Sequence, residues 1–182
     1  MKFGPITVQD KTGRDIVLRS AEESDAAALL SYLKITAAET PFLIREPDEI
    51  TLNETEERFF LKRKADSPRE LILTAWEGRN HIGNCSLMSM GEARRHAHRC
   101  GVAIALYRVY WGRGIGRIML EAVLEIARGS GYEQAELEAA ADNKRAVALY
   151  EGVGFRRYGL LPNNMKYPDG RYCDAVWMMK RL

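Results

Sequence analysis

The sequence predicts an α+β fold, with a mixed, mostly antiparallel central sheet flanked by helices, in one domain over residues 1–182. Two observations lead to this prediction. A hairpin-like pair of apolar–polar runs comes first, and a strand–helix–strand–helix–strand order follows from about residue 102. No internal repeat or low-complexity linker divides the chain, and 182 residues suit one core better than two.

Strand and helix signals alternate along the first half of the chain. The expected elements are a strand at 16–19, a capped helix from about 24 to 38, a loop at 40–50 that contains two prolines, a helix that follows Asn53, and a hairpin at 71–76 and 81–90. In the helix after Asn53 we expect Phe59, Phe60 and Leu61 to be buried.

The second half alternates more regularly. The expected elements are a strand at 102–107, a helix from Ile115 to about residue 129, a strand at 134–140, a helix that begins at Asp142 or Asn143 and ends near Glu151, and a strand at 172–182. This order predicts that the glycine-rich segment before Ile115 joins a strand to a helix.

Composition argues against several classes of protein. The 27 basic and 25 acidic residues leave no basic excess for a dedicated nucleic-acid binder. No apolar run approaches the roughly 20 residues of a membrane span, and Met1–Pro5 lacks the apolar core of a signal peptide. Three well-separated cysteines indicate neither a disulfide framework nor a zinc site, so we expect a cytoplasmic protein without a metal.

The segment Tyr110–Gly116, Tyr-Trp-Gly-Arg-Gly-Ile-Gly, runs directly into an amphipathic helix. The apolar face of that helix consists of Ile115, Ile118, Met119, Ala122, Val123 and Ile126. No Ser, Thr, Asp or Asn caps its first N–H groups, and the glycines let a ligand approach the bare backbone. Because free N–H groups and the positive end of a helix dipole bind anions, a phosphate is the expected ligand.

The glycine spacing differs from that of two well-known phosphate loops. A Walker loop ends in Gly-Lys-Ser/Thr, whereas this segment continues as Gly116-Arg117-Ile118. A dinucleotide fingerprint counted from Gly112 needs a glycine where Arg117 stands. The basic residues Arg113 and Arg117 lie on or beside the expected anion site.

Two motifs together are similar to those of the GNAT (GCN5-related N-acetyltransferase) superfamily. Tyr110–Gly116 resembles its acetyl-CoA pyrophosphate loop. Asp142–Tyr150, followed by Gly154-Phe155, resembles its second motif, Asn-x-x-Ala-x-x-Leu-Tyr ending in Gly-Phe. The two motifs stand in the superfamily's order, separated by one helix and one strand. The likeness covers about 16–182 in element order and about 104–155 in quotable residues.

The resemblance implies a binding role for each matched position. The loop residues whose N–H groups would bind the pyrophosphate of acetyl-CoA are Gly112, Arg113, Gly114, Ile115, Gly116 and Arg117. The backbone of Ile104, Ala105 and Leu106 would pair with the pantetheine arm, and Asn143 would hydrogen-bond to that arm. Asn143 also suits a helix cap. The side chains of Arg113 and Arg117 are either solvated or in contact with the adenosine 3′-phosphate.

The implied reaction moves an acetyl group from a thioester to an amine. An amine with a pKa near ~10 is mostly protonated at neutral pH, so it must lose a proton before it attacks. Backbone N–H groups on the strand before the loop could stabilise the oxyanion that forms. A phenol with a pKa near ~10 can protonate the departing thiolate, which makes Tyr150 a candidate general acid, although a core aromatic is the other interpretation of this residue.

The chain departs from the superfamily's pattern at two positions. Trp111 stands where Arg or Gln is often found; because the phosphate contacts are mainly with the backbone, we expect this change to be tolerated. Gly101 stands near a position that often holds a Glu or Asp general base, and glycine cannot accept a proton. Glu39, Glu138, His98 or a relayed water are the candidates for the base.

The expected function is an N-acetyltransferase that moves acetyl from acetyl-CoA to a primary amine of a small molecule, amino acid or peptide by direct attack. Glu39 and Phe42, next to or within the 40–50 loop, are candidates for contacts with the acceptor. One alternative is acetylation of a ribosomal or other protein N-terminus. The other is a non-catalytic acyl-CoA sensor, which Gly101 would favour. The resemblance leaves a homodimer open.

Overall fold

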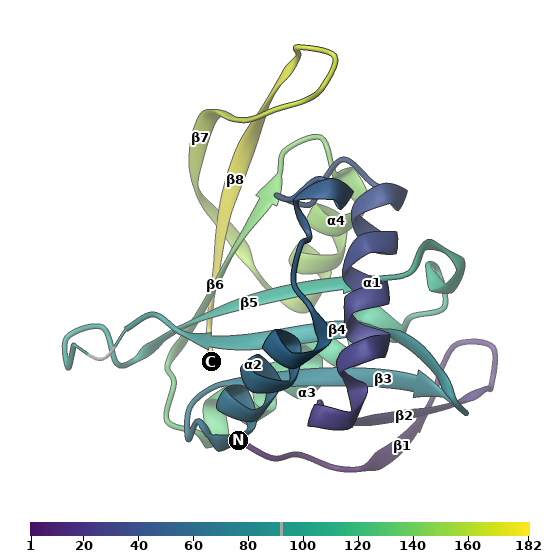
Figure 1. Cartoon of the computed structure of the whole chain (residues 1–182). Coiled ribbons are helices and arrows are strands. Elements are labelled where there is room, and N and C mark those ends of the chain that lie inside the picture. The colour runs from purple at the N-terminus through teal and green to yellow at the C-terminus, as the bar shows by residue number, and fades with distance from the viewer. Residues whose placement is uncertain (92) are drawn as a thin grey trace.

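Eight strands form one sheet in the order β1-β2-β3-β4-β5-β6-β8-β7 (Figure 1). The structure is a computed structural model and describes residues 1–91 and 93–182. Among the described strands, β5 and β6 run parallel and all other neighbours are antiparallel. The predicted mixed, mostly antiparallel sheet flanked by helices is confirmed.

The elements have the following bounds. The strands are β1 Ile6–Gln9, β2 Asp15–Ser20, β3 Leu71–Glu77, β4 Asn80–Ser89, β5 Arg99–Leu106, β6 Gln134–Ala140, β7 Arg156–Lys166 and β8 Tyr172–Arg181. The α-helices are α1 Ala26–Glu39, α2 Glu54–Asp66, α3 Ile115–Gly129 and α4 Lys144–Val153. Short 3-10 turns occupy Glu23–Asp25, Pro47–Glu49 and Arg108–Tyr110.

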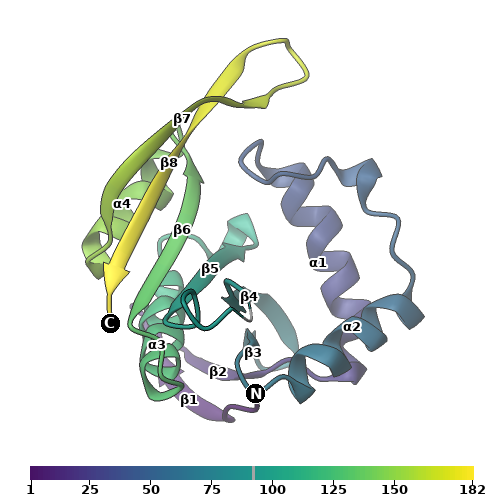
Figure 2. The ribbon, with the colours of Figure 1, turned by 90° about the vertical axis from the view of Figure 1, so that its left-hand side faces the viewer.

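Helices cover the two faces of the sheet unequally. α3 and α4 pack on one face, and α1 and α2 lie on the other (Figure 2). The main core lies under α3 and α4, where Met119, Leu120 and Val123 are fully buried. α1 and α2 contact β3 and β4. In the described part of the chain, they leave the same face of β6, β7 and β8 without a covering helix (Figure 2).

β5 and β6 are paired at one end and separate at the other. Residues 99–101 of β5 pair with residues 134–136 of β6, whereas the rest of β5 pairs with β4 alone. Beyond Gly101, β6 continues beside β8. One edge of β5 from Val102 to Leu106 is therefore open, and we call the space between the two diverging strands the β5–β6 gap.

The hydrogen-bonding pattern of β4 and β5 shows which backbone groups face this gap. Tyr107 N–H donates to the Ile82 carbonyl at 3.0 Å. Hydrogen-bonded and non-bonded pairs alternate along an antiparallel ladder, so the backbone of Ala105 faces β4. The N–H and C=O groups of Ile104 and the C=O group of Val102 therefore face the gap, whereas the N–H of Val102 belongs to the last pairing with β6.

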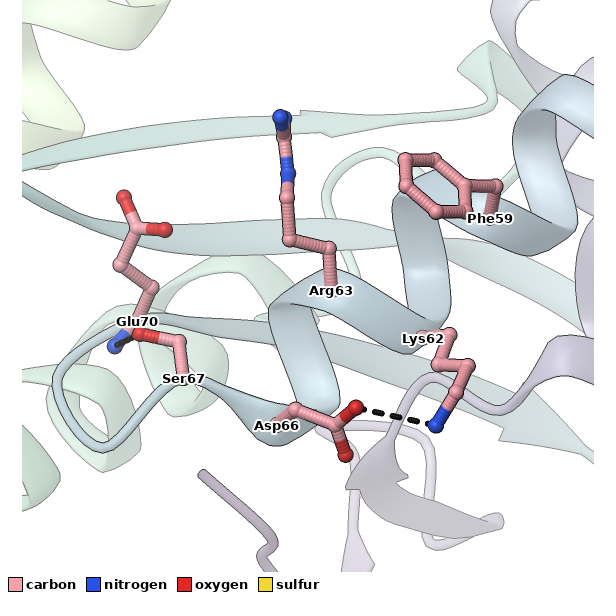
Figure 3. Close-up of a pocket in the computed structure, with 6 residues that line it drawn as sticks. All are labelled: Phe59, Lys62, Arg63, Asp66, Ser67 and Glu70. Atoms are coloured by element: carbon pink, nitrogen blue, oxygen red, sulfur yellow. Dashed lines mark hydrogen bonds and ion pairs between the residues drawn. The ribbon is translucent and has the colours of Figure 1, made fainter.

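Helix α2 begins at its predicted cap but buries fewer residues than expected. Asn53 Oδ1 accepts a hydrogen bond from Glu56 N–H at 3.0 Å. Leu61 is buried, but Phe59 is 69 % exposed, so the prediction that Phe59 is buried was wrong. Consecutive helical residues are about 100° apart, and three in a row cannot share one face. Phe59 instead lines a surface pocket together with Lys62, Arg63, Asp66, Ser67 and Glu70 (Figure 3).

β1 and β7 were not predicted, and β5 begins earlier than expected. β1 is only four residues long. β7 contains Gly159 and Pro162, and its pairing with β8 shifts register twice, which removes the alternating pattern of a regular strand. β5 begins at Arg99 rather than Val102. Within residues 1–91 and 93–182, no helix has the length and apolar character needed to cross a membrane.

Candidate active site

The glycine-rich segment presents a row of free backbone N–H groups. Gly112 and Gly114 have φ values of 83° and 84°, a region that glycine adopts without strain. The N–H groups of Arg117 and Ile118 bond back to the Gly114 carbonyl at 3.1 and 3.3 Å. Those of residues 112–116 have no hydrogen-bond acceptor among the described residues. Five free amides at the positive end of a long helix form a site that fits a diphosphate.

Trp111 fastens this loop to the end of β5. Its Nε1 donates to the Leu106 carbonyl at 2.9 Å. The guanidinium carbons of Arg108 and Arg145 lie 5.6 and 4.9 Å from the centre of its ring. The indole therefore supports the loop from the side and leaves the amides after it free, which gives a physical reason for a tryptophan at this position.

Arg113 joins the loop to the turn between β1 and β2. Its Nε lies 2.5 Å from Asp10 Oδ2, and its Nη2 lies 2.6 Å from Glu77 Oε1. The Asp10 side chain is inaccessible to solvent and also accepts from Thr12 and Arg14. Burial alone would raise the pKa of Asp10, but its hydrogen bonds from Thr12, Arg113 and Arg14 hold that pKa well below its usual range.

We expect an Asp10→Asn variant to be less stable than the wild type near neutral pH and to approach it in acid. Because the folded-state pKa of Asp10 is lowered, its stabilising effect is present above the unfolded pKa near ~3.9 and is lost as pH falls through the folded value. Thermal midpoints measured from about pH 7 to about pH 2 test this expectation.

Asp48→Asn, on the exposed turn Pro47–Glu49, is the matched control for that series. A difference between Asp10→Asn and the wild type that stays constant over the whole pH range would show that the charge of Asp10 is not what stabilises the fold.

Tyr150 lies in the last turn of α4 and is 7 % exposed. Its ring packs at 6.2 Å from that of Phe155. Its hydroxyl has no hydrogen-bond partner among the described residues, yet it is not among the polar atoms that are fully sealed from solvent. Burial, and secondarily the proximity of Cys85, raises the pKa of Tyr150, so the phenol keeps its proton throughout the neutral range.

Asn143 is the N-cap of α4. Its Oδ1 accepts from Ala146 N–H at 3.1 Å, so the predicted capping interaction is confirmed. The side-chain Nδ2 of Asn143 has no hydrogen-bond partner among the described residues. Cap and ligand roles are therefore compatible.

Glu138 projects from the sheet face opposite to α3 and α4. Residues 135, 137 and 139 of β6 belong to the core under those helices, and alternate residues of a strand point to opposite faces. Glu138 is exposed, and its Oε1 accepts from Asn164 Nδ2 at 2.8 Å. The residue therefore stands beside the β5–β6 gap, on its open face.

Glu136 is a carboxylate beside Gly101 that the sequence did not reveal. It is the register partner of Gly101 on the neighbouring strand. Arg99 Nε and Nη2 lie 2.5 and 2.7 Å from its two oxygens. The hydrogen bonds from Arg99 lower the pKa of Glu136, so this carboxylate is held as an ion pair. Only the strand register shows it, because no local motif links residues 101 and 136.

The other predicted site residues lie in different places. Glu39 Oε2 accepts from Arg108 N–H at 2.7 Å, which engages this carboxylate at the end of β5. Phe42 packs against a small cluster formed by β6 and the β7–β8 hairpin. His98 precedes β5, and its carbonyl accepts two N–H groups at the start of β6. It therefore lies at the paired end of β5 and β6, away from the gap.

Within residues 1–91 and 93–182, no group of three or more His, Cys, Asp or Glu side chains is arranged to hold a metal ion.

Comparison with known proteins identifies the family. A family described as acetyltransferase (GNAT) domain matches residues 15–156. N-alpha-acetyltransferase RimI from Mycobacterium tuberculosis (strain ATCC 25618 / H37Rv) is 37 % identical over 101 residues, which cover 54 % of this chain and 60 % of that protein. The chain thus spans less than two thirds of the length of this relative.

Solved structures share the whole architecture. The acetyltransferase of GNAT family from Streptococcus pneumoniae is 28 % identical with a TM-score of 0.87, covering 92 % of this chain and 99 % of that one. yncA from Salmonella typhimurium, solved with its cofactor acetyl-CoA, has the same fold at 17 % identity, with a TM-score of 0.81 over 92 % of this chain and 94 % of that one. The chain therefore belongs to the GNAT family of acetyl-CoA-dependent N-acetyltransferases.

Proposed function

We propose that this chain, acting as a single domain over residues 1–182, transfers acetyl from acetyl-CoA to a primary amine. The observation that carries the proposal is the row of unpartnered amides at residues 112–116, which includes two left-handed glycines and lies next to the β5–β6 gap. Family membership supports the choice of acetyl-CoA as the ligand of those amides.

The proposed cofactor site uses backbone groups more than side chains. The amides of 112–116 would bind the pyrophosphate, and the Nδ2 group of Asn143 would hydrogen-bond to the pantetheine arm. Of the predicted strand residues, Ile104 offers both of its backbone groups to that arm, whereas those of Ala105 face β4. The Leu106 carbonyl is engaged by Trp111. The carbonyl of Val102 would join Ile104 in this role.

The two proposed proton-transfer groups lie on opposite faces of the sheet. Bound acetyl-CoA supplies the activated acetyl group as a thioester. Glu138, on the open face, would accept the proton that the amine loses, and Tyr150, on the α3 and α4 side, would donate a proton to the departing sulfur. Because β5 and β6 separate beyond Gly101, the gap is open to both faces of the sheet, and each group can approach it from its own face. This arrangement supports direct transfer without a covalent enzyme intermediate.

The uncovered face of the sheet suits an acceptor with apolar or aromatic groups beside its amine. Trp177, the register partner of Glu138, is 41 % exposed, and Tyr158 is 50 % exposed with its ring 6.0 Å away. Phe42 borders the same face. We propose that Phe42, rather than Glu39, contacts the acceptor, because Arg108 already engages the Glu39 carboxylate.

A peptide or protein N-terminus is the second candidate acceptor. It is favoured by one observation, the 37 % identity over 101 residues to a protein named N-alpha-acetyltransferase RimI. A free α-amino group has a pKa of about 8, so a larger share of it is deprotonated at neutral pH than of an alkylamine.

Thermal unfolding and turnover together test the proposed function. Acetyl-CoA at one hundred times its dissociation constant adds about 2.7 kcal/mol, which raises the midpoint by several degrees for a domain of this size. Release of free thiol would then be measured with small amines, amino acids and peptides, each peptide paired with its N-acetylated form. Binding without thiol release for any acceptor would indicate a sensor, and no thermal shift at millimolar acetyl-CoA would refute the proposal.

We expect a Glu138→Gln variant to lose at least about tenfold in kcat/KM near neutral pH, because a positioned base typically contributes 10²–10⁴-fold. The difference in kcat/KM between the variant and the wild type should become smaller as pH rises, since the acceptor amine then loses its proton in solution. The measurement is the pH profile of kcat/KM for both proteins.

Glu39→Gln and Glu133→Gln provide the comparison for this prediction. Glu39 is another carboxylate near the gap, and Glu133 is an exposed carboxylate just before β6. Both variants should keep most of the activity. A larger loss of kcat/KM in Glu39→Gln than in Glu138→Gln would identify Glu39, at the end of α1, as the base.

A further inference from the structure

The side chains of Arg113 and Arg117, the two basic residues in or beside the glycine loop, are bound to other protein groups. The Arg113 guanidinium is divided between Asp10 and Glu77. Arg117 Nη1 donates to the Gly152 carbonyl at 2.8 Å and lies 3.4 Å from a carboxylate oxygen of Glu121. A bound cofactor phosphate would have to compete with these partners. Its countercharge must therefore come from other side chains.

Lys11 lies directly over Gly114. The neighbouring pair Asp10 and Arg113, which are 103 residues apart in the chain, brings the two segments together. Lys11 N–H donates to the Arg113 carbonyl at 3.0 Å. A Cβ added at Gly114 would lie 2.9 Å from Lys11 Cγ and 3.1 Å from its Cε. The exposed ammonium has no ion-pair or hydrogen-bond partner among the described residues. The β1–β2 turn thus places an ammonium group without a described partner beside Gly114.

Arg145 makes the equivalent approach to the first glycine. It extends from the first turn of α4, and its guanidinium carbon lies 4.9 Å from the centre of the Trp111 ring. Its Nη2 lies 3.5 Å from the position that a Cβ at Gly112 would take. Among residues 1–91 and 93–182 it has no carboxylate partner. Stacking on Trp111 therefore holds the guanidinium beside the loop with its charge free.

We propose that Lys11 and Arg145 bind the phosphate groups of coenzyme A from the two sides of the glycine loop. This inference rests on the proposed function, since it concerns the ligand of the same amides. It adds the β1–β2 turn to the cofactor site, although residues 1–14 lie outside the family match at 15–156. The Asp10–Arg113–Glu77 cluster then has a positioning role, because it fixes the turn that carries Lys11 against the loop.

Two chemical sources of phosphate are available within the one ligand. The pyrophosphate would bind at the free amides of residues 112–116, and the 3′-phosphate carries further negative charge. Both are recognised by the same chemistry, a cation that donates charge-assisted hydrogen bonds at an exposed site. Comparison of coenzyme A with dephospho-coenzyme A separates them, because the second ligand lacks only the 3′-phosphate.

Calorimetric titration of the wild type, Lys11→Met and Arg145→Met with both ligands tests the proposal. Each variant should bind coenzyme A about tenfold more weakly and with a weaker dependence on salt, as expected when one charged contact is lost. Equal losses for both ligands assign the residue to the pyrophosphate, and a loss confined to coenzyme A assigns it to the 3′-phosphate. The unliganded thermal midpoint of Lys11→Met should stay unchanged, because its ammonium has no described partner, whereas that of Arg145→Met should fall slightly, because the stacking of its guanidinium on Trp111 is lost.

Lys34→Met, on the exposed surface of α1, is the control for net charge and should bind like the wild type. Dissociation constants within twofold of the wild type in both test variants, or the same loss in Lys34→Met, would overturn the inference while leaving the proposed function intact. Failure of the wild type to bind coenzyme A would instead remove the proposed function, and this inference with it.

Discussion

Replacing Gly114 with glutamate is expected to abolish binding of acetyl-CoA. Gly114 has φ 84°, and a Cβ there would lie 2.9 Å from Lys11 Cγ, so the lysine stem must move. The added carboxylate would lie among the free amides of the loop, where it repels the cofactor phosphates and competes for the same N–H groups. The wild type should show a thermal shift of several degrees with saturating acetyl-CoA, and Gly114→Glu should show none.

Gly131→Glu separates this effect from backbone strain. Gly131 follows the other end of α3 and has φ 81°, so it imposes the same left-handed conformation on the new side chain, at a cost of about 1 kcal/mol. No atom lies within 4 Å of its added Cβ. The control should be less stable than the wild type but should retain its thermal shift. Retention of wild-type affinity by Gly114→Glu would mean that the amides at the start of α3 do not hold the phosphates.

Local periodicity predicted the elements that shape the site. The apolar positions of α3 recur at helical spacing because one side of that helix packs on the sheet, and β6 alternates because its residues divide between a core and an open face. Both elements could therefore be predicted from neighbouring residues alone. β7 could not be, since its two register shifts make each side chain depend on its partner strand rather than on its own sequence.

The contacts that complete the site cross long stretches of chain. Glu136 lies beside Gly101 only because β5 and β6 are in register there. Lys11 reaches Gly114 because a buried carboxylate, Asp10, pairs with an arginine in the loop. No spacing rule relates such positions in a single sequence. By contrast, the loop itself could be predicted, because consecutive residues form its row of amides.

We expect the Tyr150→Phe variant to lose about 100-fold or more in kcat while binding acetyl-CoA with a dissociation constant within twofold of the wild type. A positioned general acid contributes typically 10²–10⁴-fold, and removal of the hydroxyl leaves the departing thiolate without a proton donor. Burial raises the pKa of Tyr150, so in the wild type the donor stays protonated, and titration of this group should not lower kcat below about pH 10.

The fold should tolerate this change unusually well. The Tyr150 hydroxyl has no partner among the described residues, so Tyr150→Phe breaks no hydrogen bond in the free protein, and the ring keeps its packing against Phe155. Tyr132 is the matched control, since it is also buried and its hydroxyl donates to the Arg69 carbonyl at 2.9 Å. Tyr132→Phe should lose about 1 kcal/mol, or roughly 2–4 °C, and keep its turnover.

The two variants should therefore separate stability from catalysis in opposite directions. Tyr150→Phe should unfold at the wild-type temperature without ligand but have a lower kcat. Tyr132→Phe should unfold at a lower temperature but keep the wild-type kcat. Unchanged kcat in Tyr150→Phe would remove this residue from the mechanism and leave the thiolate to depart into water. Equal loss of kcat in both variants would show that packing of the core in general, rather than a proton from Tyr150, limits the reaction, because both tyrosines are buried and they differ in the environment of their hydroxyl groups.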